Sequence, residues 1–213
     1  MDDQEQEFGR FIPVADADFV HFEGLRELYM ARCTDVTDAA FEHLRGIHTL
    51  DMSCCDQPAI TDAAFAHLAG IQRLSIAGCA QATITDAAFA HLRGVQLLNM
   101  GSCSQLTDAA FVHLRGIHTL YMWYCRQPAI TDAAFAHLCG IHTLAMSGCN
   151  QATITGAGFA HLKGIHALGM FQCSDEQVAT ARSLGLPVNT RSCTSCGGLH
   201  YTFDERDGDE EAE

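Results

Sequence analysis

Thiols at regular spacing are the first feature of this sequence that could do chemistry. Seven cysteines recur at steps of 22 or 24 residues: Cys33, Cys55, Cys79, Cys103, Cys125, Cys149 and Cys173. Sulfur atoms in such a column can lie near the distances of a disulfide bond or a shared metal ion. Free cysteine also fills small buried apolar sites, and we favour that structural role for the column. Cys54 and Cys139 lie off the column and are the better candidates for reactive thiols.

Histidine forms two further columns. The first precedes a recurring leucine at His21, His43, His67, His91, His113, His137 and His161, and the second comprises His48, His118, His142 and His166. A zinc site needs three or four ligands that converge on one point, so we expect the first column to lie on an outer surface without metal. The second column predicts a pH-responsive edge, because histidine gains its charge between about pH 5 and 8.

A single C-x-x-C motif, Cys193 and Cys196 with His200 nearby, is a weak candidate for a metal site. Motifs of hydrolases, phosphate-binding loops and metalloproteases are missing from the sequence. A recurring aspartate is explained by its place at helix starts. We therefore expect a protein that is not an enzyme and has no cofactor.

These columns belong to a repeat, whose copies start at residues 25, 47, 71, 95, 117, 141 and 165. The first half of each copy, Ile-x-x-Leu-x-Met-x-x-Cys, alternates with period two and predicts a strand. The second half, Ile-Thr-Asp-Ala-Ala-Phe-Ala-His-Leu-x-Gly, predicts a helix. In the second copy Thr61 is its N-cap, Phe65 and Leu68 face inward, and Gly70 ends it.

This pattern resembles the cysteine-containing leucine-rich repeats found in the arrays of F-box proteins. The resemblance covers about residues 15 to 190, with methionine and phenylalanine at two positions where leucine is usual. It implies an α/β solenoid: a short curved arc with parallel strands on the concave face and helices on the convex face. It also suggests a substrate-adaptor role in a ubiquitin ligase, although we recognise no F-box ahead of the repeats, which leaves a stand-alone or decoy receptor as the alternative.

We expect the chain to comprise five segments. They are an acidic tail (1–13), a capping half-repeat helix (14–24), a seven-strand array (25–173), a capping helix and exit (174–190), and a C-x-x-C segment with a disordered acidic tail (191–213).

The charge of the chain narrows its partners. Its 12 Lys+Arg and 26 Asp+Glu give a net charge of -14, which disfavours a nucleic-acid partner. No run of about 18 apolar residues and no basic leader occurs, so we expect an intracellular protein without membrane contact. Residues 1–8 and 204–213 hold 11 of the acids and one of the bases, so the body between them has a net charge of only -4.

Variable positions beside the core methionine indicate where a partner binds. In the fifth copy they concentrate Tyr121, Trp123 and Tyr124, with Arg126 just beyond, and these residue types dominate binding hot spots. Large side chains that merely cover small neighbours are the simpler alternative. The predicted partner-binding set is Tyr121, Trp123, Tyr124, Arg126, Asn99, Phe171, Arg73 and Leu97.

The first hypothesis is therefore a module that recognises a protein or peptide on the concave face, centred on the fifth copy. The second is a metal-binding or pH-responsive structural protein. Self-association into a homo-oligomer through the same aromatic patch is also open.

Overall fold

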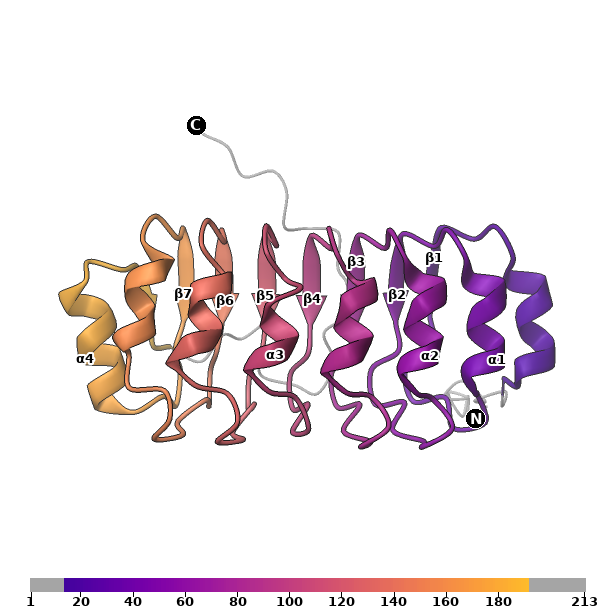
Figure 1. Cartoon of the computed structure of the whole chain (residues 1–213), viewed down its shortest axis with the longest axis horizontal. Helices are drawn as coiled ribbons and strands as arrows, with labels where there is room; N and C mark the ends of the chain where they lie inside the picture. Colours follow the sequence, from indigo (N-terminus) through magenta and orange to yellow (C-terminus); the bar gives the residue numbers. More distant parts are fainter. Residues whose placement is uncertain (1–13, 192–213) are drawn as a thin grey trace, which may run out of the picture.

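The computed structural model describes residues 14–191, which form one parallel sheet whose strands follow one another in chain order. Figure 1 shows the strands side by side along the long axis, with a layer of helices in front of them. The strands are β1 (Glu27–Tyr29), β2 (Thr49–Asp51), β3 (Arg73–Ser75), β4 (Leu97–Asn99), β5 (Thr119–Tyr121), β6 (Thr143–Ala145), β7 (Ala167–Gly169) and β8 (Val188–Asn189). Neighbouring repeat strands pair with equivalent residues opposite each other, such as Leu50 with Leu74. The chain is an α/β leucine-rich repeat solenoid.

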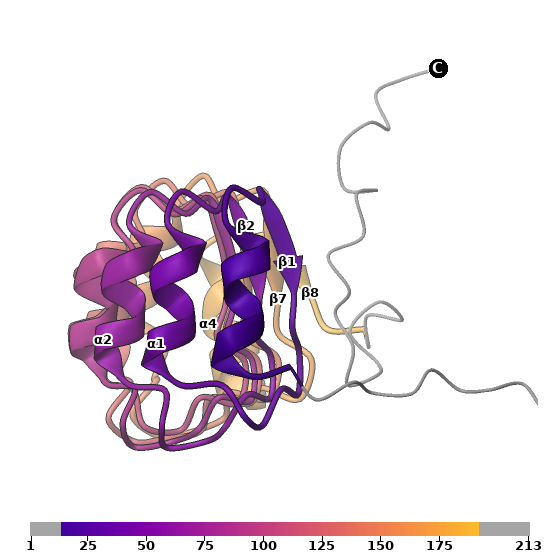
Figure 2. The same ribbon diagram turned by 90° about the vertical axis from the view of Figure 1, so that its right-hand side faces the viewer.

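The period-two pattern places one side of each strand in the core. Leu50 is fully buried between sheet and helices, and Met52 follows it into the core. Figure 2 shows that the helices cover only one side of the sheet. We call the opposite side the sheet face. β8 was not expected from the sequence, because Val188 and Asn189 lie beyond the last repeat, where they pair with β7.

Helical segments are shorter than the repeat pattern suggests, and most are 3-10 in part or throughout. Only eight residues, 62–69, lie between the Thr61 cap and the turn at Gly70. Because a 3-10 turn rises further per residue than an α turn, it covers this distance with fewer residues. The α segments are α1 (Asp38–Phe41), α2 (Asp62–Phe65), α3 (Asp108–Phe111) and α4 (Asp175–Ser183). The 3-10 segments are η1 (Asp16–Phe22), η2 (Glu42–Leu44), η3 (Ala66–Leu68), η4 (Asp86–His91), η5 (Asp132–His137) and η6 (Ala157–Leu162).

A column of phenylalanines forms the centre of the core. The fully buried rings are Phe19, Phe41, Phe65, Phe89, Phe111, Phe135 and Phe159. η1 brings the first of them to the N-terminal end, and α4 lies at the C-terminal end of the array (Figure 1). The ends of the solenoid are thereby closed by helices rather than left as exposed core.

Carboxylates link each repeat to the next. The Asp38 carboxylate accepts hydrogen bonds from the Thr61 amide at 2.7 Å and the Thr61 hydroxyl at 2.6 Å. The Thr61 hydroxyl in turn accepts a bond from the Ala63 amide, which confirms its predicted capping role. The same pairing recurs in Asp16–Thr37, Asp62–Thr85, Asp86–Thr107, Asp108–Thr131 and Asp132–Thr155. The aspartates therefore join neighbouring repeats as well as starting helices.

The cysteine column packs in the interior. Cys149 Sγ donates to the Met122 carbonyl at 2.9 Å, and the thiols from Cys55 to Cys173 make the same bond to the preceding repeat. Burial raises the pKa of Cys55 and Cys125 to about 12, so these thiols stay protonated and are poor nucleophiles or metal ligands. The described cysteines are all free, with Cys139 exposed.

Candidate functional site

Side chains at the exits of the strands share an unusual backbone conformation. One residue per repeat has a φ between 57° and 76°: Arg32, Cys54, Gly78, Ser102, Tyr124, Gly148 and Gln172. Only two of the seven are glycine, although the left-handed region costs other residues about 1–2 kcal/mol. Their amides extend the sheet, since the Cys54 N–H donates to the Ala77 carbonyl at 2.7 Å. The array thus holds a column of side chains at one end of the sheet face despite a backbone cost, a feature that clusters at functional sites.

A cavity of about 120 Å³ lies beside this column on the sheet face. Its lining comes from the first four repeats, with Trp123 of the fifth repeat as one wall: Ala31, Arg32, Asp51, Ser53, Cys54, Ala77, Gly78, Asn99, Ser102 and Trp123. We call this space the sheet-face cavity.

The polar residues on the floor of the sheet-face cavity are few and almost withdrawn from solvent, and most of the exposed lining is apolar. Asp51 and Asn99 line it and are 6% and 3% exposed, and Ser75 between them is 1% exposed. The Asp51 carboxylate accepts a bond from the Ser53 amide at 2.9 Å, and the Ser53 and Ser75 hydroxyls lie 2.7 Å apart. Such a floor offers oriented hydrogen-bonding groups to a ligand, while Trp123 offers an apolar surface.

The two large rings of the fifth repeat point in opposite directions along the array. A Cβ on Gly101, in the fourth repeat, would lie 2.4 Å from the Trp123 indole, and one on Gly148, in the sixth, would lie 2.4 Å from the Tyr124 ring. The rings therefore rest on glycines of the neighbouring repeats. The two glycines permit this close contact because they lack a side chain.

Tyr124 is further held by polar contacts on its side of the array. Its hydroxyl donates to Gln172 Oε1 at 3.1 Å, and the Arg126 guanidinium lies 5.0 Å from its ring centre. The Arg126 Nε donates to the Gly148 carbonyl at 2.9 Å. Tyr124 remains 42% exposed, so it is a fixed aromatic surface on the side of the fifth repeat that faces away from the cavity. Fixed aromatic side chains lose little entropy when a partner binds.

The structure separates the predicted site residues into four groups. Asn99 and Trp123 line the sheet-face cavity, and Tyr121 pairs with Asn99 in the sheet. Tyr124 and Arg126 lie on the other side of the fifth repeat. Phe171 lies in the seventh repeat, where its carbonyl accepts a bond from the Gly148 amide, and its side chain is half-buried.

Arg73 and Leu97, the remaining two predicted residues, begin β3 and β4 and lie opposite each other. They are outside the lining of the cavity, which lies past the other end of these strands. The cavity extends toward the first repeat rather than lying around the fifth. Residues such as Arg32 and Cys54 were in the variable columns of the sequence, but only the backbone geometry shows that they wall a cavity.

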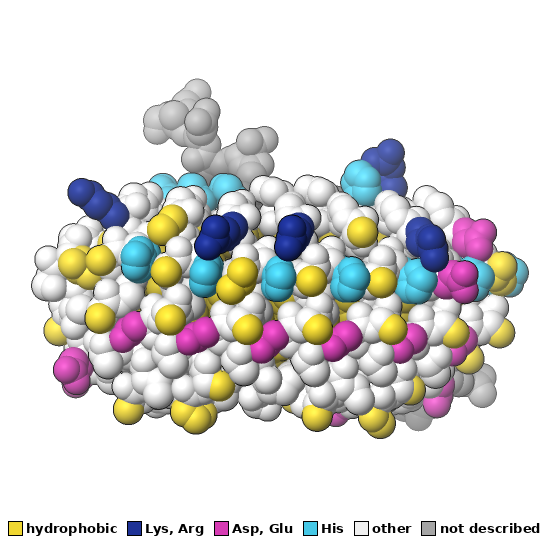
Figure 3. All heavy atoms as spheres, in the orientation of Figure 1, with side chains coloured by type: hydrophobic (Ala, Val, Ile, Leu, Met, Phe, Trp, Pro, Cys, Tyr) yellow, Lys and Arg dark blue, Asp and Glu magenta, His cyan; other side chains and the backbone are white. Residues whose placement is uncertain are grey.

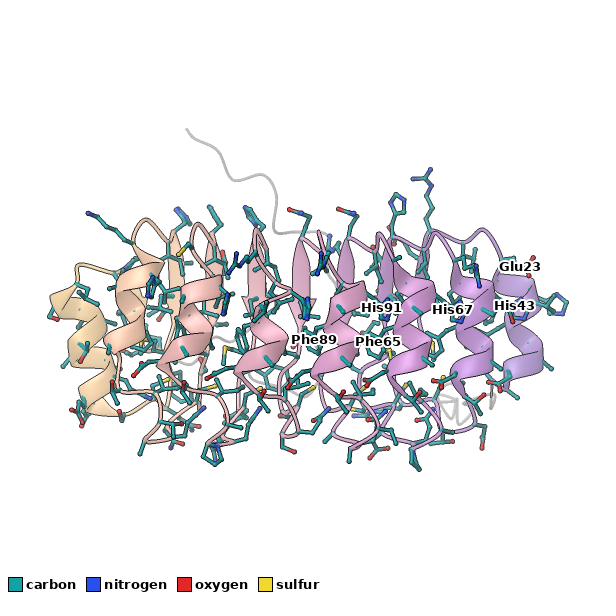
Figure 4. All side chains as sticks on the ribbon, in the orientation of Figure 1. Glu23, His43, Phe65, His67, Phe89 and His91 are labelled. Atoms are coloured by element: carbon teal, nitrogen blue, oxygen red, sulfur yellow. The ribbon has the colours of Figure 1, made fainter. Side chains whose placement is uncertain are left out.

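Histidines occupy the helix face and one edge of the sheet. Figure 3, which faces the helices, shows a row of histidines above a row of acids. Figure 4 labels His43, His67 and His91 on successive repeats, and His43 Nδ1 lies 2.7 Å from Glu23 Oε1. In the second column the rings of His118, His142 and His166 stack, with centroids 4.5 and 4.6 Å apart.

Acidification should weaken the fold through the stacked histidines. Desolvation and the adjacent His118 and His166 lower the pKa of His142 below its ordinary value of 6.5. The unfolded chain thus binds this proton more readily, so stability is lost as pH falls through 6.5 toward the folded pKa. We expect the melting temperature to fall between pH 7.5 and 5.5, and to fall less in His142→Gln. Gln72 and Gln96 occupy this position in two other repeats, and equal pH profiles for both proteins would contradict the prediction.

Residues 14–191 contain no cluster of three or more potential ligands that could hold a metal ion. The weak candidates Cys193, Cys196 and His200 lie outside the described residues, as do both predicted acidic tails. Within the described chain, no helix has the length and apolar character needed to cross a bilayer.

Similarity to known proteins is detectable in structure. No family model and no curated protein matches the sequence. The fold is similar to leucine-rich repeat chains in the Drosophila Toll–Spatzle complex (12% identity, TM-score 0.54) and the yeast Rad7–Elc1 complex (21%, 0.53). It is also similar to a chain in the TLR13–ssRNA13 complex (15%, 0.56).

These matches cover 73%, 84% and 75% of this chain, but 25%, 44% and 27% of the three solved chains, in the same order. This chain therefore spans less than half the length of each. At these identities the likeness establishes the leucine-rich repeat fold alone.

Proposed function

We propose that this protein is a non-enzymatic recognition module that binds a protein or peptide on its sheet face. The carrying observation is the fixed pair of rings in the fifth repeat, along a column of left-handed residues: Trp123 walls the sheet-face cavity, and Tyr124 extends the aromatic surface toward the sixth repeat. Aromatic anchors with a hydrogen-bonding floor are typical of polypeptide recognition. The protein partners named for the Toll and Rad7 complexes are consistent with this use of the fold.

The subtype of leucine-rich repeat and the cellular role in this proposal come from the sequence pattern. A buried cysteine in every repeat, donating to the preceding repeat, supports the cysteine-containing subtype. We propose further that the protein acts inside the cell as an adaptor-like or decoy receptor, as the resemblance to the repeat arrays of F-box proteins suggests. Co-purification of ubiquitin-ligase subunits with the intact protein would support the adaptor role, and their absence from purified partner complexes would contradict it.

Removal of the two rings tests the site. Trp123→Ala combined with Tyr124→Ala should abolish partner capture in a pull-down compared by mass spectrometry with the intact protein. Trp123 is half-buried, Tyr124 is exposed and neither belongs to the buried core, so we expect the free energy of unfolding to change by only about 1 kcal/mol. Capture that survives in this folded variant would refute the site.

Two further variants separate the loss of binding from a loss of folding. Gly101→Ala keeps both rings but places a Cβ where the Trp123 indole lies, so it should also weaken capture. Val112→Ala alters an exposed apolar side chain on the helix-bearing side and should leave capture unchanged. Full capture by the Gly101 variant would show that the position of the indole is unimportant.

The histidine stack favours a second candidate function, a pH-responsive structural protein. Because the stacked rings lie at the starts of successive strands, their protonation is coupled to the stability of the sheet. Zinc quantification on the purified full chain tests the related metal hypothesis, and stoichiometric zinc would favour it over the recognition module. Light scattering distinguishes self-association through the aromatic patch from recognition of a different partner.

A further inference from the structure

We propose that the C-terminal segment, residues 192–213, binds the sheet face of its own chain and competes there with the partner. Its aromatic stretch, residues 199–203 (Leu-His-Tyr-Thr-Phe), is placed in the sheet-face cavity against Trp123. The choice of surface rests on the proposed function. The segment would act as a built-in ligand that a partner must displace.

The path of the described chain delivers the segment to this face. After α4 the chain forms β8 at the edge of the sheet, and the Arg191 amide donates to Asn189 Oδ1 at 2.9 Å. Figure 2 shows the last described residues leaving β8 on the side of the sheet opposite the helices. The segment thus begins on the side where the cavity lies.

The segment is long enough to reach the cavity. Its first 12 residues, 192–203, include the aromatic stretch and span up to roughly 40 Å when extended. Strands that pair in a sheet lie about 4.8 Å apart, so β8 and β2 are separated by about 29 Å. The segment can cross the sheet face to the first repeats with chain to spare.

The chemistry of the segment matches the surface that it would meet. Tyr201 and Phe203 supply rings for the Trp123 wall, and the Tyr201 hydroxyl can donate to the acceptors of the floor, Asp51 among them. Residues 204–213 contain seven acids and one arginine. Arg32 lines the cavity and supplies a positive charge near the place where these acids would lie.

Because the C-terminal segment is attached to the domain that it binds, even a weak contact is sufficient to occupy the sheet face. A short flexible linker gives an effective concentration on the order of 1 mM, so a segment with a Kd of about 0.1 mM would be bound for about nine tenths of the time. A partner that needs the open face would then bind about tenfold more weakly than it would to a chain with a released segment. The tail would thereby set a threshold for recognition.

Trp123 is the only tryptophan of the chain, so its fluorescence monitors the cavity directly. In the full chain, Tyr201→Ser combined with Phe203→Ser should shift the emission to longer wavelength and increase acrylamide quenching. A synthetic peptide of residues 192–213 should reverse both changes in a saturable way. The control, Val112→Ala, alters an exposed side chain on the helix-bearing side, keeps the whole C-terminal segment and should retain the wild-type emission maximum.

Identical emission and quenching in the aromatic variant, with no response to the peptide, would overturn the inference. A wild-type spectrum that changes on dilution would also overturn it, because binding between copies depends on concentration and binding within one chain does not. The proposed function fails separately, when the Trp123 and Tyr124 double variant still captures the partner.

Discussion

Replacing Asp132 by alanine is expected to lower the free energy of unfolding by about 2–4 kcal/mol. Its carboxylate accepts bonds from the Thr155 hydroxyl at 2.6 Å and from the amides of Thr155, Gly156 and Gly158 at 3.0 to 3.2 Å. The variant leaves four donors without their acceptor. The figure lies below the sum for four charged hydrogen bonds, because the site is partly solvated and water can replace the carboxylate. Urea titration followed by circular dichroism measures the loss.

The pH dependence of stability separates the contribution of the Asp132 charge from the contribution of its side-chain shape. Burial acts to raise the pKa of Asp132, but the bonds from Thr155, Gly158 and Gly156 outweigh it and hold the pKa below 3.8. The ionised carboxylate thus stabilises the fold above that value, and the contribution is lost as pH falls through the folded pKa. The stability gap between wild type and Asp132→Ala should therefore narrow in acid. A gap below about 0.5 kcal/mol at pH 7 would contradict the role assigned to this ladder.

The aspartate ladder marks a limit of the sequence analysis. The sequence placed an aspartate at the start of each helix, and Asp38 and Asp62 are there. It did not show that each carboxylate spans to the threonine of the next repeat, since that contact depends on how repeats stack. Glutamines were missed for the same reason: Gln81 and Gln105 donate to carbonyls of the preceding repeat.

The fold itself was predictable because its signals are local and repeated. Period-two alternation, a capping threonine and a terminal glycine recur in most copies, so strand register and buried face follow from any one of them. Length within the helical half was less predictable, because α and 3-10 turns bury the same phenylalanine. β8 carries no repeat signal, and it forms because β7 would otherwise leave an unpaired edge.

The candidate site was predictable in composition and less so in position. Variation between copies marked Trp123 and Tyr124, but periodicity does not say which way each ring turns. The glycines decide it, since Gly101 admits the indole on one side and Gly148 admits the phenol on the other. The left-handed column was also hidden, because Arg32 has no local signature of a positive φ.

Phe135→Ala is expected to be at least as destabilising as Asp132→Ala and to lower the free energy of unfolding by about 3–5 kcal/mol. The ring is fully buried and meets Phe159 of the next repeat edge-to-face, with centroids 5.1 Å apart. Each repeat of a solenoid contacts only its neighbours, so a cavity here weakens the junction between the fifth and sixth repeats as well as the fifth repeat itself. We expect a lower urea midpoint and a broader transition, because the two sides of the junction unfold less cooperatively.

Two variants calibrate this result. Phe135→Leu restores the residue usual at this position in the family that the sequence resembles, and should cost only about 1–1.5 kcal/mol, since leucine fills most of the space. Val112→Ala removes a side chain that is 45% exposed and should cost less than about 0.5 kcal/mol. A Phe135→Ala protein within 1 kcal/mol of wild type would show that the phenylalanine column does not carry the core. If Phe135→Ala loses the full expected stability but the unfolding transition keeps its cooperativity, the coupling extends beyond adjacent repeats.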